Sequence, residues 1–256
     1  LSAVETARRV APTAAPVLLT GETGVGKERF ARSVHAASGA EDGPFVALNC
    51  GALGRDLLAS ELFGYAEGAF TGARKGGMIG KIEAANGGTL FLDELGEMPL
   101  DLQPMFLRAL EEREICRLGE VAPRRVDFRL VAATNRDLKG AVTEGRFRAD
   151  LYYRVAVVAI RIPPLRERTG EIPRLVAHFE AEVVRRYGLP ERRLSPAAVR
   201  RLEAQHWPGN VRELRNVVES ALLTAVGDVV EAADLPLDAA PARAAAGEDA
   251  AAGLSA

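Results

Sequence analysis

Hydrophobic positions before residue 163 fall into short continuous runs instead of alternating with polar residues. The runs cover residues 16–20, 45–49, 88–94, 126–135 and 155–162. Continuous apolar runs of this length are typical of strands that are covered on both faces. Segments with helical character separate them, beginning with the stretch from Lys27 to about Ala37. The pattern predicts an α/β fold with an open, mostly parallel, five-stranded sheet and helices on both faces.

The pattern changes to helices only after the segment PPLRER at residues 163–168. One predicted helix covers about 171–187, and a second begins at Ser195 with a proline in its first position. A third begins at Asn210, with Glu213 three residues later, which is the spacing of a capping box. A small all-α domain is therefore expected to follow the sheet.

These changes divide the chain into three predicted parts. Residues 1–165 form the α/β domain, residues 166–237 the helical domain, and the alanine-rich residues 238–256 a flexible linker or tail. Because Leu1 lies inside an apparent helix, we expect the chain to be one part of a longer protein.

A glycine-rich segment, GETGVGKE, stands between the first predicted strand and the first helix and fits the spacing G-x4-G-K of a phosphate-binding loop. Its residues are Gly21, Glu22, Thr23, Gly24, Val25, Gly26, Lys27 and Glu28. The glycines let successive N–H groups point into one concavity, and the lysine can reach the outer phosphates of a nucleotide. The alternative is an ordinary glycine turn, which the strand–loop–helix context makes the weaker interpretation.

Glu28 occupies the position where a serine or threonine hydroxyl usually binds Mg²⁺. A carboxylate near phosphates is repulsive unless it faces the metal, its waters or away from the site. Glu28 taken alone is therefore also consistent with a loop that binds nucleotide poorly.

The third predicted strand ends in Asp93 and Glu94. At that place Asp93 can hold Mg²⁺, directly or through water, and Glu94 can polarise an attacking water. For the pair taken alone, two acids that cap the next turn are an equally good interpretation. Because the pair follows a phosphate-binding loop, nucleotide hydrolysis is favoured.

Further candidates lie at the end of the fourth strand and beyond it. Thr134 and Asn135 would face the γ-phosphate and the water, because ligands of parallel sheets lie beyond the carboxyl ends of the strands. A plain turn is the alternative. Arg148 and Arg154, six residues apart on a predicted helix, would point about 120° apart. One of them can act in trans on a neighbour's nucleotide, and ordinary surface charge is the alternative.

Arg212 lies in the first turn of the third helix of the helical domain. A cation there is unfavourable for the helix dipole, which suggests that the arginine serves an anion. A surface arginine is the alternative.

The segment EGAFTGARKGG, at residues 67–77, fits neither a strand nor a helix. A single large apolar side chain, Phe70, stands among small residues and glycines that make the backbone costly to order. We interpret the segment as a mobile loop whose apolar tip meets a partner.

Composition excludes several functions. The net charge of −2 provides no overall basic field for nucleic acid. The two cysteines, Cys50 and Cys116, indicate neither a disulfide framework nor a metal site, and Cys50 is expected to be a buried thiol. No apolar stretch approaches the roughly 20 residues of a membrane helix. These features predict a cytoplasmic protein with no membrane partner.

In this order, the motifs resemble the AAA+ ATPase domain of the bacterial sigma-54-dependent transcriptional activators. The resemblance extends from about Val17 to Leu237 and rests on GETGVGKE, GAFTGA, GGTLFLDE, FRADLYYR, PPLRER and WPGNVREL. GAFTGA beside a phosphate-binding loop is highly specific, whereas a phosphate-binding loop alone is not. The resemblance implies a P-loop AAA+ fold with a helical lid domain and a remodelling loop at residues 62–80.

The resemblance also implies a role for each matching residue. ATP and Mg²⁺ would be bound with Lys27 on the β- and γ-phosphates and Asp93 on the metal. Glu94 would activate water, and Asn49 would restrain Glu94 until the remodelling loop is engaged. Thr134 and Asn135 would sense the γ-phosphate, and Arg212 would sense the nucleotide. Arg148 and Arg154 would be the candidates for the arginine finger, which reaches the nucleotide of a neighbouring subunit. The sigma factor would be contacted by Gly68, Ala69, Phe70, Thr71, Gly72 and Ala73.

The implied partner is the sigma-54 RNA polymerase holoenzyme, whose closed promoter complex the motor would convert to the open form. The implied assembly is a homo-oligomeric ring, usually a hexamer and in some members a heptamer. Promoter or enhancer DNA would be contacted only through a C-terminal domain that this sequence does not include.

The sequence departs from the family pattern around the loop. Tyr65 and Glu67 stand where histidine and lysine are more usual. The stretch RKGGMIGKIE, at residues 74–83, is one residue longer than in many relatives and has glycines in place of basic residues. This variant is similar to activators of acetoin or dihydroxyacetone metabolism. Two alternatives to a sigma-54 motor stay open: another AAA+ remodelling motor, and a nucleotide-switched assembly module without significant turnover.

Overall fold

The computed structural model describes residues 2–237, which form two compact units. The first unit runs to Thr169 and also takes in His206–Glu213, while the second contains Gly170–Gln205 and the chain from Leu214 onward. The sequence places the division after residue 165, and it gives no sign that a short segment from the later part of the chain joins the first unit. The tail predicted over 238–256 lies outside the described residues.

The first unit contains the α/β elements. Its helices are α1 (Ala3–Val10), α2 (Lys27–Ala36), α3 (Arg55–Phe63), α4 (Lys81–Ala84), η1 (Leu95–Glu97), α5 (Gln103–Glu111), α6 (Leu138–Thr143), α7 (Ala149–Val155) and η2 (Leu165–Glu167). Its strands are β1 (Val17–Thr20), β2 (Phe45–Asn49), β3 (Gly64–Tyr65), β4 (Met78–Ile79), β5 (Thr89–Asp93), β6 (Glu114–Ile115), β7 (Arg124–Arg125), β8 (Arg129–Thr134) and β9 (Val158–Arg161).

The later part of the chain is mainly helical. It contains η3 (Thr169–Glu171), α8 (Ile172–Tyr187), α9 (Pro196–Glu203), α10 (Asn210–Thr224) and η4 (Ala232–Asp234), and a strand pair that the sequence pattern does not predict, β10 (Arg193–Leu194) with β11 (Val229–Val230). Among the described helices, none combines the length and apolar character that crossing a membrane requires.

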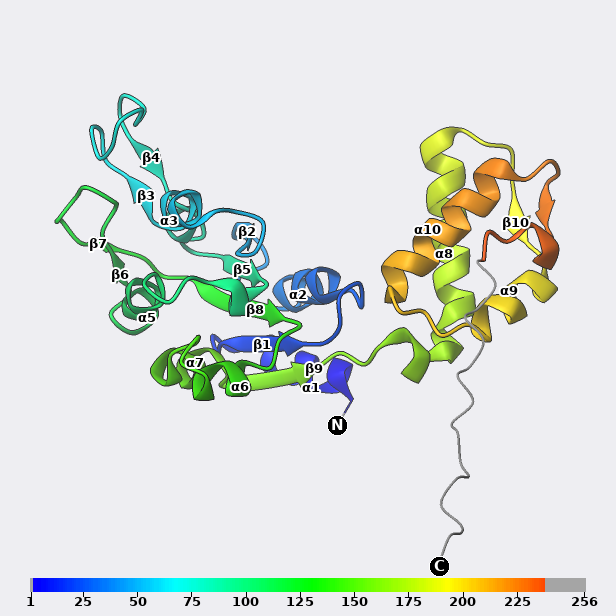
Figure 1. Ribbon diagram of the computed structural model, residues 1–256, viewed down its shortest axis with the longest axis horizontal. Helices are drawn as coiled ribbons and strands as arrows, with labels where there is room; N and C mark the ends of the chain where they lie inside the picture. The colour runs from blue at the N-terminus through cyan, green and yellow to red at the C-terminus, as the bar shows by residue number, and fades with distance from the viewer. Residues whose placement is uncertain (1, 238–256) are drawn as a thin grey trace, which may run out of the picture. The chain divides into compact units, whose positions relative to one another are not determined.

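The main sheet has five parallel strands in the order β2-β5-β8-β1-β9, which confirms the predicted architecture (Figure 1). Its register brings the strand ends together, because Thr20 is the partner of Thr134 and Asn49 is the partner of Asp93. The carboxyl ends of four neighbouring strands therefore carry most of the polar residues that the sequence singles out.

Side chains on the central strands alternate between two apolar clusters, one on each face of the sheet. On β1, Leu18 joins one cluster, while Val17 and Leu19 join the other. The Val17 face is covered by α1 and α2, and the Leu18 face by α3, α5, α6 and α7. This two-sided burial explains why the strands read as continuous apolar runs.

Two loops extend from the same side of the first unit (Figure 1). One joins β3 to β4 and contains Phe70, and the other joins β6 to β7. They are linked at the base, because Ala66 N–H donates to the carbonyl oxygen of Leu118 at 2.9 Å. The remodelling loop predicted at 62–80 therefore has an ordered antiparallel base, in which Tyr65 pairs with Met78.

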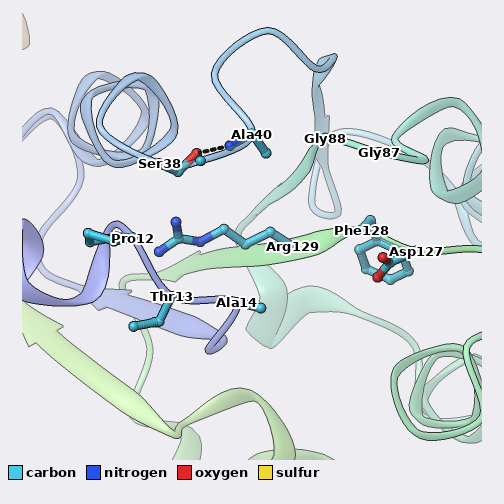
Figure 2. Close-up of a pocket in the computed structure, with 11 residues that line it drawn as sticks. Pro12, Thr13, Ala14, Ser38, Ala40, Gly87, Gly88, Asp127, Phe128 and Arg129 are labelled. Atoms are coloured by element: carbon cyan, nitrogen blue, oxygen red, sulfur yellow. Dashed lines mark hydrogen bonds between the residues drawn. The ribbon is translucent and has the colours of Figure 1, made fainter.

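A cavity of about 220 Å³ lies where the strands of the main sheet begin, at the end of the sheet opposite to the carboxyl ends of the strands (Figure 2). The Arg129 side chain extends from β8 toward the end of α1, where its guanidinium donates to the carbonyl oxygens of Val10 and Ala11. Arg129 is only 6% exposed, and its Nε finds no hydrogen-bond partner among the described residues. Arg129 thus ties α1 to the sheet by satisfying carbonyl groups at the helix terminus.

Replacing Arg129 with alanine is expected to lower the free energy of unfolding by about 2–3 kcal/mol, because two charge-assisted hydrogen bonds and buried packing are lost. Urea unfolding followed by circular dichroism measures the change. The matched control is Arg125→Ala, whose side chain is 94% exposed and which should change stability by less than about 0.5 kcal/mol. Equal stability of Arg129→Ala and the wild type would contradict the anchoring role.

The capping box predicted at Asn210 is wrong. The Asn210 side chain bonds to Leu165, Glu22 and Thr23 instead of to the first turn of its own helix. Glu213 does reach back, as predicted, but it accepts the N–H of Gly209 at 2.7 Å. A contact distant in the sequence therefore replaced the local one.

Candidate functional site

The glycine-rich loop leads from β1 into α2, as predicted. Gly26 stands before the helix with φ +100°, a conformation that L side chains rarely adopt. Lys27 is 8% exposed, and its Nζ donates to the carbonyl oxygens of Gly21 at 2.8 Å and Glu22 at 3.1 Å. Its ammonium group thus lies folded against the loop where phosphates are expected.

Burial and neighbouring charges act in opposite directions on Lys27. Burial lowers the pKa of Lys27, the nearby Asp93 and Glu94 raise it, and the positive charge of Arg212 lowers it further. Arg212 is exposed, and its backbone N–H donates to the Gly24 carbonyl oxygen at 3.3 Å. Two cations, one on the loop and one on α10, therefore share the same neighbourhood within the first unit.

Glu28 does not face the loop. Its Oε1 accepts from Arg32 Nη2 at 2.8 Å and Nε at 3.1 Å, one turn along α2. Its side chain is 53% exposed. The carboxylate that replaces the usual hydroxyl is therefore directed to a partner on its own helix, which limits its repulsion toward a phosphate.

Asp93 and Glu94 end β5 beside the loop. Burial raises the pKa of Asp93, and the Glu94 N–H that donates to its Oδ1 at 3.0 Å lowers it. Glu94, the first residue after β5, adopts a left-handed backbone conformation with φ +52°. The Glu94 carboxylate lies against Gly51, where an added Cβ would be 2.3 Å from its Oε2.

Asn49 lies next to this acid pair, but it holds a different partner. Its Oδ1 accepts from the N–H groups of Gly51 at 2.8 Å and Ala52 at 3.0 Å. Asn49 thus shapes the turn on which the Glu94 carboxylate rests. Cys50, which lies between Asn49 and Gly51 in the sequence, is buried as predicted, and burial raises its pKa to about 12.

The ends of β8 and β1 complete the edge. Asn135 Nδ2 donates to Thr23 Oγ1 at 3.1 Å, so this predicted sensor contacts the glycine-rich loop directly. Thr134 is 1% exposed, and its carbonyl oxygen accepts from Gly21 N–H at 3.3 Å. The structure therefore brings together the loop, the two acids and the two strand-end residues that the sequence names.

The two finger candidates, Arg148 and Arg154, bond to partners outside this cluster. Arg148 precedes α7, is exposed and forms a two-pronged pair with Asp150. Arg154 is exposed on α7 and donates from Nη2 to the carbonyl oxygen of Leu110 at 2.9 Å.

The GAFTGA segment, Gly68–Ala73, lies between β3 and β4. Phe70 is 47% exposed and meets the ring of the buried Tyr65, with centroids 4.9 Å apart. Glu67 Oε2 accepts from Gly76 N–H at 3.1 Å, and Gly77 lies so close to Tyr65 that an added Cβ would be 2.3 Å from the Tyr65 oxygen. The residues that depart from the family pattern are thus in contact with one another.

The sequence motifs contain further site residues to which sequence reasoning gives no role. Arg166, in PPLRER, donates to Glu22 from Nη1 at 2.8 Å and from Nη2 at 2.5 Å, and Asn210, in WPGN, donates to Glu22 at 3.1 Å. Gly24 lies against Gly209, where an added Cβ on Gly24 would be 2.3 Å from the Gly209 oxygen. Their partners are more than 140 positions away, so no local pattern in the sequence reveals these contacts. The only signal in the sequence is that these residues lie within recognisable motifs.

The parallel sheet, the phosphate-binding loop and the acid pair at the adjacent strand end define the class of protein as a P-loop nucleoside triphosphatase fold. Comparison with known proteins narrows this class. The Sigma-54 interaction domain family matches residues 1–161, and the AAA+ ATPase lid domain matches residues 166–252. The chain belongs to the Sigma-54 interaction domain family.

Several proteins are similar over most of the chain. A Geobacillus stearothermophilus protein named limonene hydroxylase is 52% identical over 227 residues, 88% of this chain and 42% of that protein. The sigma-54-dependent transcriptional activator SfnR of Pseudomonas putida is 49% identical over 90% of this chain and 63% of its own length. The chain thus spans less than two thirds of these relatives.

Solved structures of NtrX from Brucella abortus share the fold. The complex with ADP has a TM-score of 0.83 at 36% identity and covers 91% of this chain and 52% of that one. The complex with ATP has a TM-score of 0.80 at 36% identity and covers 91% of this chain and 54% of that one.

Gly24→Ala is expected to weaken binding of a fluorescent ATP analogue more than tenfold, because the left-handed φ of +82° and the Gly209 contact leave no room for a methyl group. Equilibrium titration of the purified variant measures the change. Gly39→Ala is the matched control, because nothing lies within 4 Å of an added Cβ there. Unchanged affinity of Gly24→Ala would show that the loop tolerates displacement from the Gly209 turn.

Proposed function

We propose that this chain is the Mg²⁺-dependent, ATP-hydrolysing motor part of a sigma-54-dependent transcription activator. The observation that carries the proposal is the convergence of Lys27, Asp93, Glu94 and Asn135 at one edge of the sheet, beside a glycine-rich loop. Membership of the Sigma-54 interaction domain family and the nucleotide complexes of a protein that is 36% identical support it.

The residues present suit a magnesium ion bound with a nucleotide. Asp93 offers a partly buried carboxylate at the strand end, and no group of three His, Cys, Asp or Glu side chains that could hold a metal occurs among the described residues. Mg²⁺ is commonly held by one or two carboxylates together with substrate phosphates and waters. Asp93 would therefore hold the ion, which would neutralise charge on the phosphates.

The chain's own groups supply the other steps of hydrolysis. Lys27 and the N–H groups of the loop would hold the β- and γ-phosphates, which requires the Lys27 ammonium to exchange its carbonyl partners for phosphate oxygens. Glu94 would orient a water and accept its proton as the new oxygen–phosphorus bond forms and the bond to ADP breaks. Thr134 and Asn135 would meet the γ-phosphate from the end of β8.

The partner surface is proposed to be the GAFTGA segment. Thr71 is exposed on this loop, Phe70 exposes 47% of its surface there, and Ile79, at the base of the loop in β4, exposes 59%. Val121 is 95% exposed on the neighbouring β6–β7 loop. Exposed apolar side chains on two linked loops are suited to protein contact, and sigma-54 in the polymerase holoenzyme is the partner that the family indicates.

Two substitutions distinguish ATP hydrolysis from its use in opening promoter complexes. Glu94→Gln should retain ATP binding and lower turnover at least a hundredfold, because the water loses its proton acceptor. Thr71→Ala should retain most of the turnover and lose formation of open promoter complexes. Phosphate release and promoter opening by the protein bearing this domain are measured, with Glu111→Gln and Thr143→Ala as exposed controls. Normal promoter opening by Thr71→Ala would contradict the sigma-54 role, and a wild type that binds ATP without turnover would favour a nucleotide-switched module.

The proposed ring assembly supplies a finger from a neighbour. Turnover per subunit should rise with protein concentration, and Arg148→Gln or Arg154→Gln should lower it about a thousandfold when that arginine is the finger. Lys27→Ala subunits, whose own sites are disabled, should restore activity when mixed with the finger variant, because they donate an intact arginine. Turnover independent of concentration, with no recovery on mixing, would contradict a finger in trans.

A further inference from the structure

Glu22 occupies a position in the glycine-rich loop, yet its carboxylate bonds to two distant segments. Arg166 donates to it from both terminal nitrogens, at 2.8 and 2.5 Å, and Asn210 Nδ2 donates at 3.1 Å. These contacts lower the pKa of Glu22 to about 2, chiefly through the Arg166 hydrogen bond. Glu22 is therefore ionised at neutral pH.

Asn210 joins three segments through one side-chain amide. It is fully buried, with φ +53°. Besides Glu22, its Nδ2 donates to the Thr23 carbonyl oxygen at 3.1 Å, and its Oδ1 accepts from Leu165 N–H at 2.8 Å. A buried amide with both ends satisfied fixes the geometry of all its partners, because any displacement leaves a buried polar group unpaired.

The segments joined here are those that lead into and out of the second unit. The chain leaves the first unit after Thr169, returns at His206 and leaves again after Glu213. Arg166 lies just before the first crossing, and Asn210 lies between the other two. One carboxylate on the glycine-rich loop thus binds to both connections.

The same contacts fix the backbone around the proposed phosphate site. The Gly24 carbonyl oxygen accepts from Val211 and Arg212 N–H groups at 3.0 and 3.3 Å, and the Glu22 carbonyl oxygen accepts from Lys27 Nζ. A shift of Glu22 would therefore displace both the lysine partner and the start of the helix that carries Arg212.

We infer that Glu22, Arg166 and Asn210 form a hinge latch, which positions the glycine-rich loop and Arg212 for one nucleotide and couples the occupied loop to the connections of the second unit. The three act as positioning residues, because their side chains bond to one another and to backbone instead of to the reacting atoms. The inference rests on the proposed nucleotide function.

The latch and simple electrostatics predict opposite results at Glu22. Glu22→Gln removes a negative charge near the phosphates, so the loss of Coulomb repulsion alone would strengthen ATP binding. Arg166→Gln removes a positive charge, so Coulomb effects alone would weaken ATP binding. Loss of the latch weakens binding in both variants, by about tenfold each, because both lose the same charge-assisted contact. The double variant should then be no weaker than either single variant by more than about twofold.

The chain contains one tryptophan, which provides a spectroscopic signature of the latch. Trp207 is 1% exposed, has a strained left-handed φ of +55° and lies three positions before Asn210. ATP binding to the 256-residue wild type should change its fluorescence. In Glu22→Gln and Arg166→Gln, saturating ATP should change it by less than half as much.

The experiment titrates wild type, both single variants and the double variant with ATP and ADP, reading a fluorescent analogue for affinity and Trp207 for the latch. Arg108→Gln is the matched control, because Arg108 pairs with the exposed Glu112 on its own helix and should change affinity by less than about twofold. Asn210→Asp, which keeps the shape but loses the donor, should resemble Glu22→Gln.

The outcomes distinguish the two proposals. Tighter binding by Glu22→Gln, additive losses in the double variant, or a wild-type Trp207 response in both single variants would overturn the latch and leave the ATPase proposal intact. A wild type that binds neither ATP nor ADP would overturn the ATPase proposal and the latch together.

Discussion

The contact of the glycine-rich loop with the turn at residues 207–210 is the constraint on which the rest of the site depends. Gly24 has to be glycine because the Gly209 backbone lies against it, and its carbonyl oxygen receives two N–H groups from the first turn of α10. Glu22 fixes the same turn through Asn210. The phosphate loop is therefore held from two sides, by the sheet through Gly21 and Thr134 and by this turn.

The sheet register sets where the chemistry gathers. Two-sided burial makes the order and alignment of the strands strongly specified, so the residues that end β1, β5 and β8 meet at one edge. Asp93 and Glu94 lie beside Lys27 for this reason, although about sixty-six positions separate them along the printed chain. The cavity near Arg129 lies at the other edge, where strands begin, and its arginine serves α1.

Much of this was predictable, because the relevant signals are local. The apolar runs predict the five-stranded sheet, and the loop spacing predicts the strand–loop–helix placement of Gly21–Glu28, both as observed. The family follows from ordered motifs. The roles of the individual site residues stay predictions, and the same holds for ring assembly and for the partner.

The rest depends on contacts between residues distant in sequence. Asn210 followed by Glu213 has the local form of a capping box, but the buried amide gains more partners from Leu165 and Thr23 than its own helix offers. The sequence suggests that the Glu28 carboxylate would repel phosphates. In the structure Arg32, one turn later, donates to that carboxylate and limits the repulsion. No periodicity in the sequence marks Arg166 as a partner of Glu22.

Hydrogen–deuterium exchange of the Val211 and Arg212 amides tests the central constraint most directly, because both donate to Gly24. With the 256-residue chain, both amides should exchange slowly without nucleotide, at rates similar to the amides of α2, and should slow further with Mg²⁺ and ATP. Exchange of both amides at the rate of an unprotected loop, unaffected by ATP, would contradict an anchored phosphate loop.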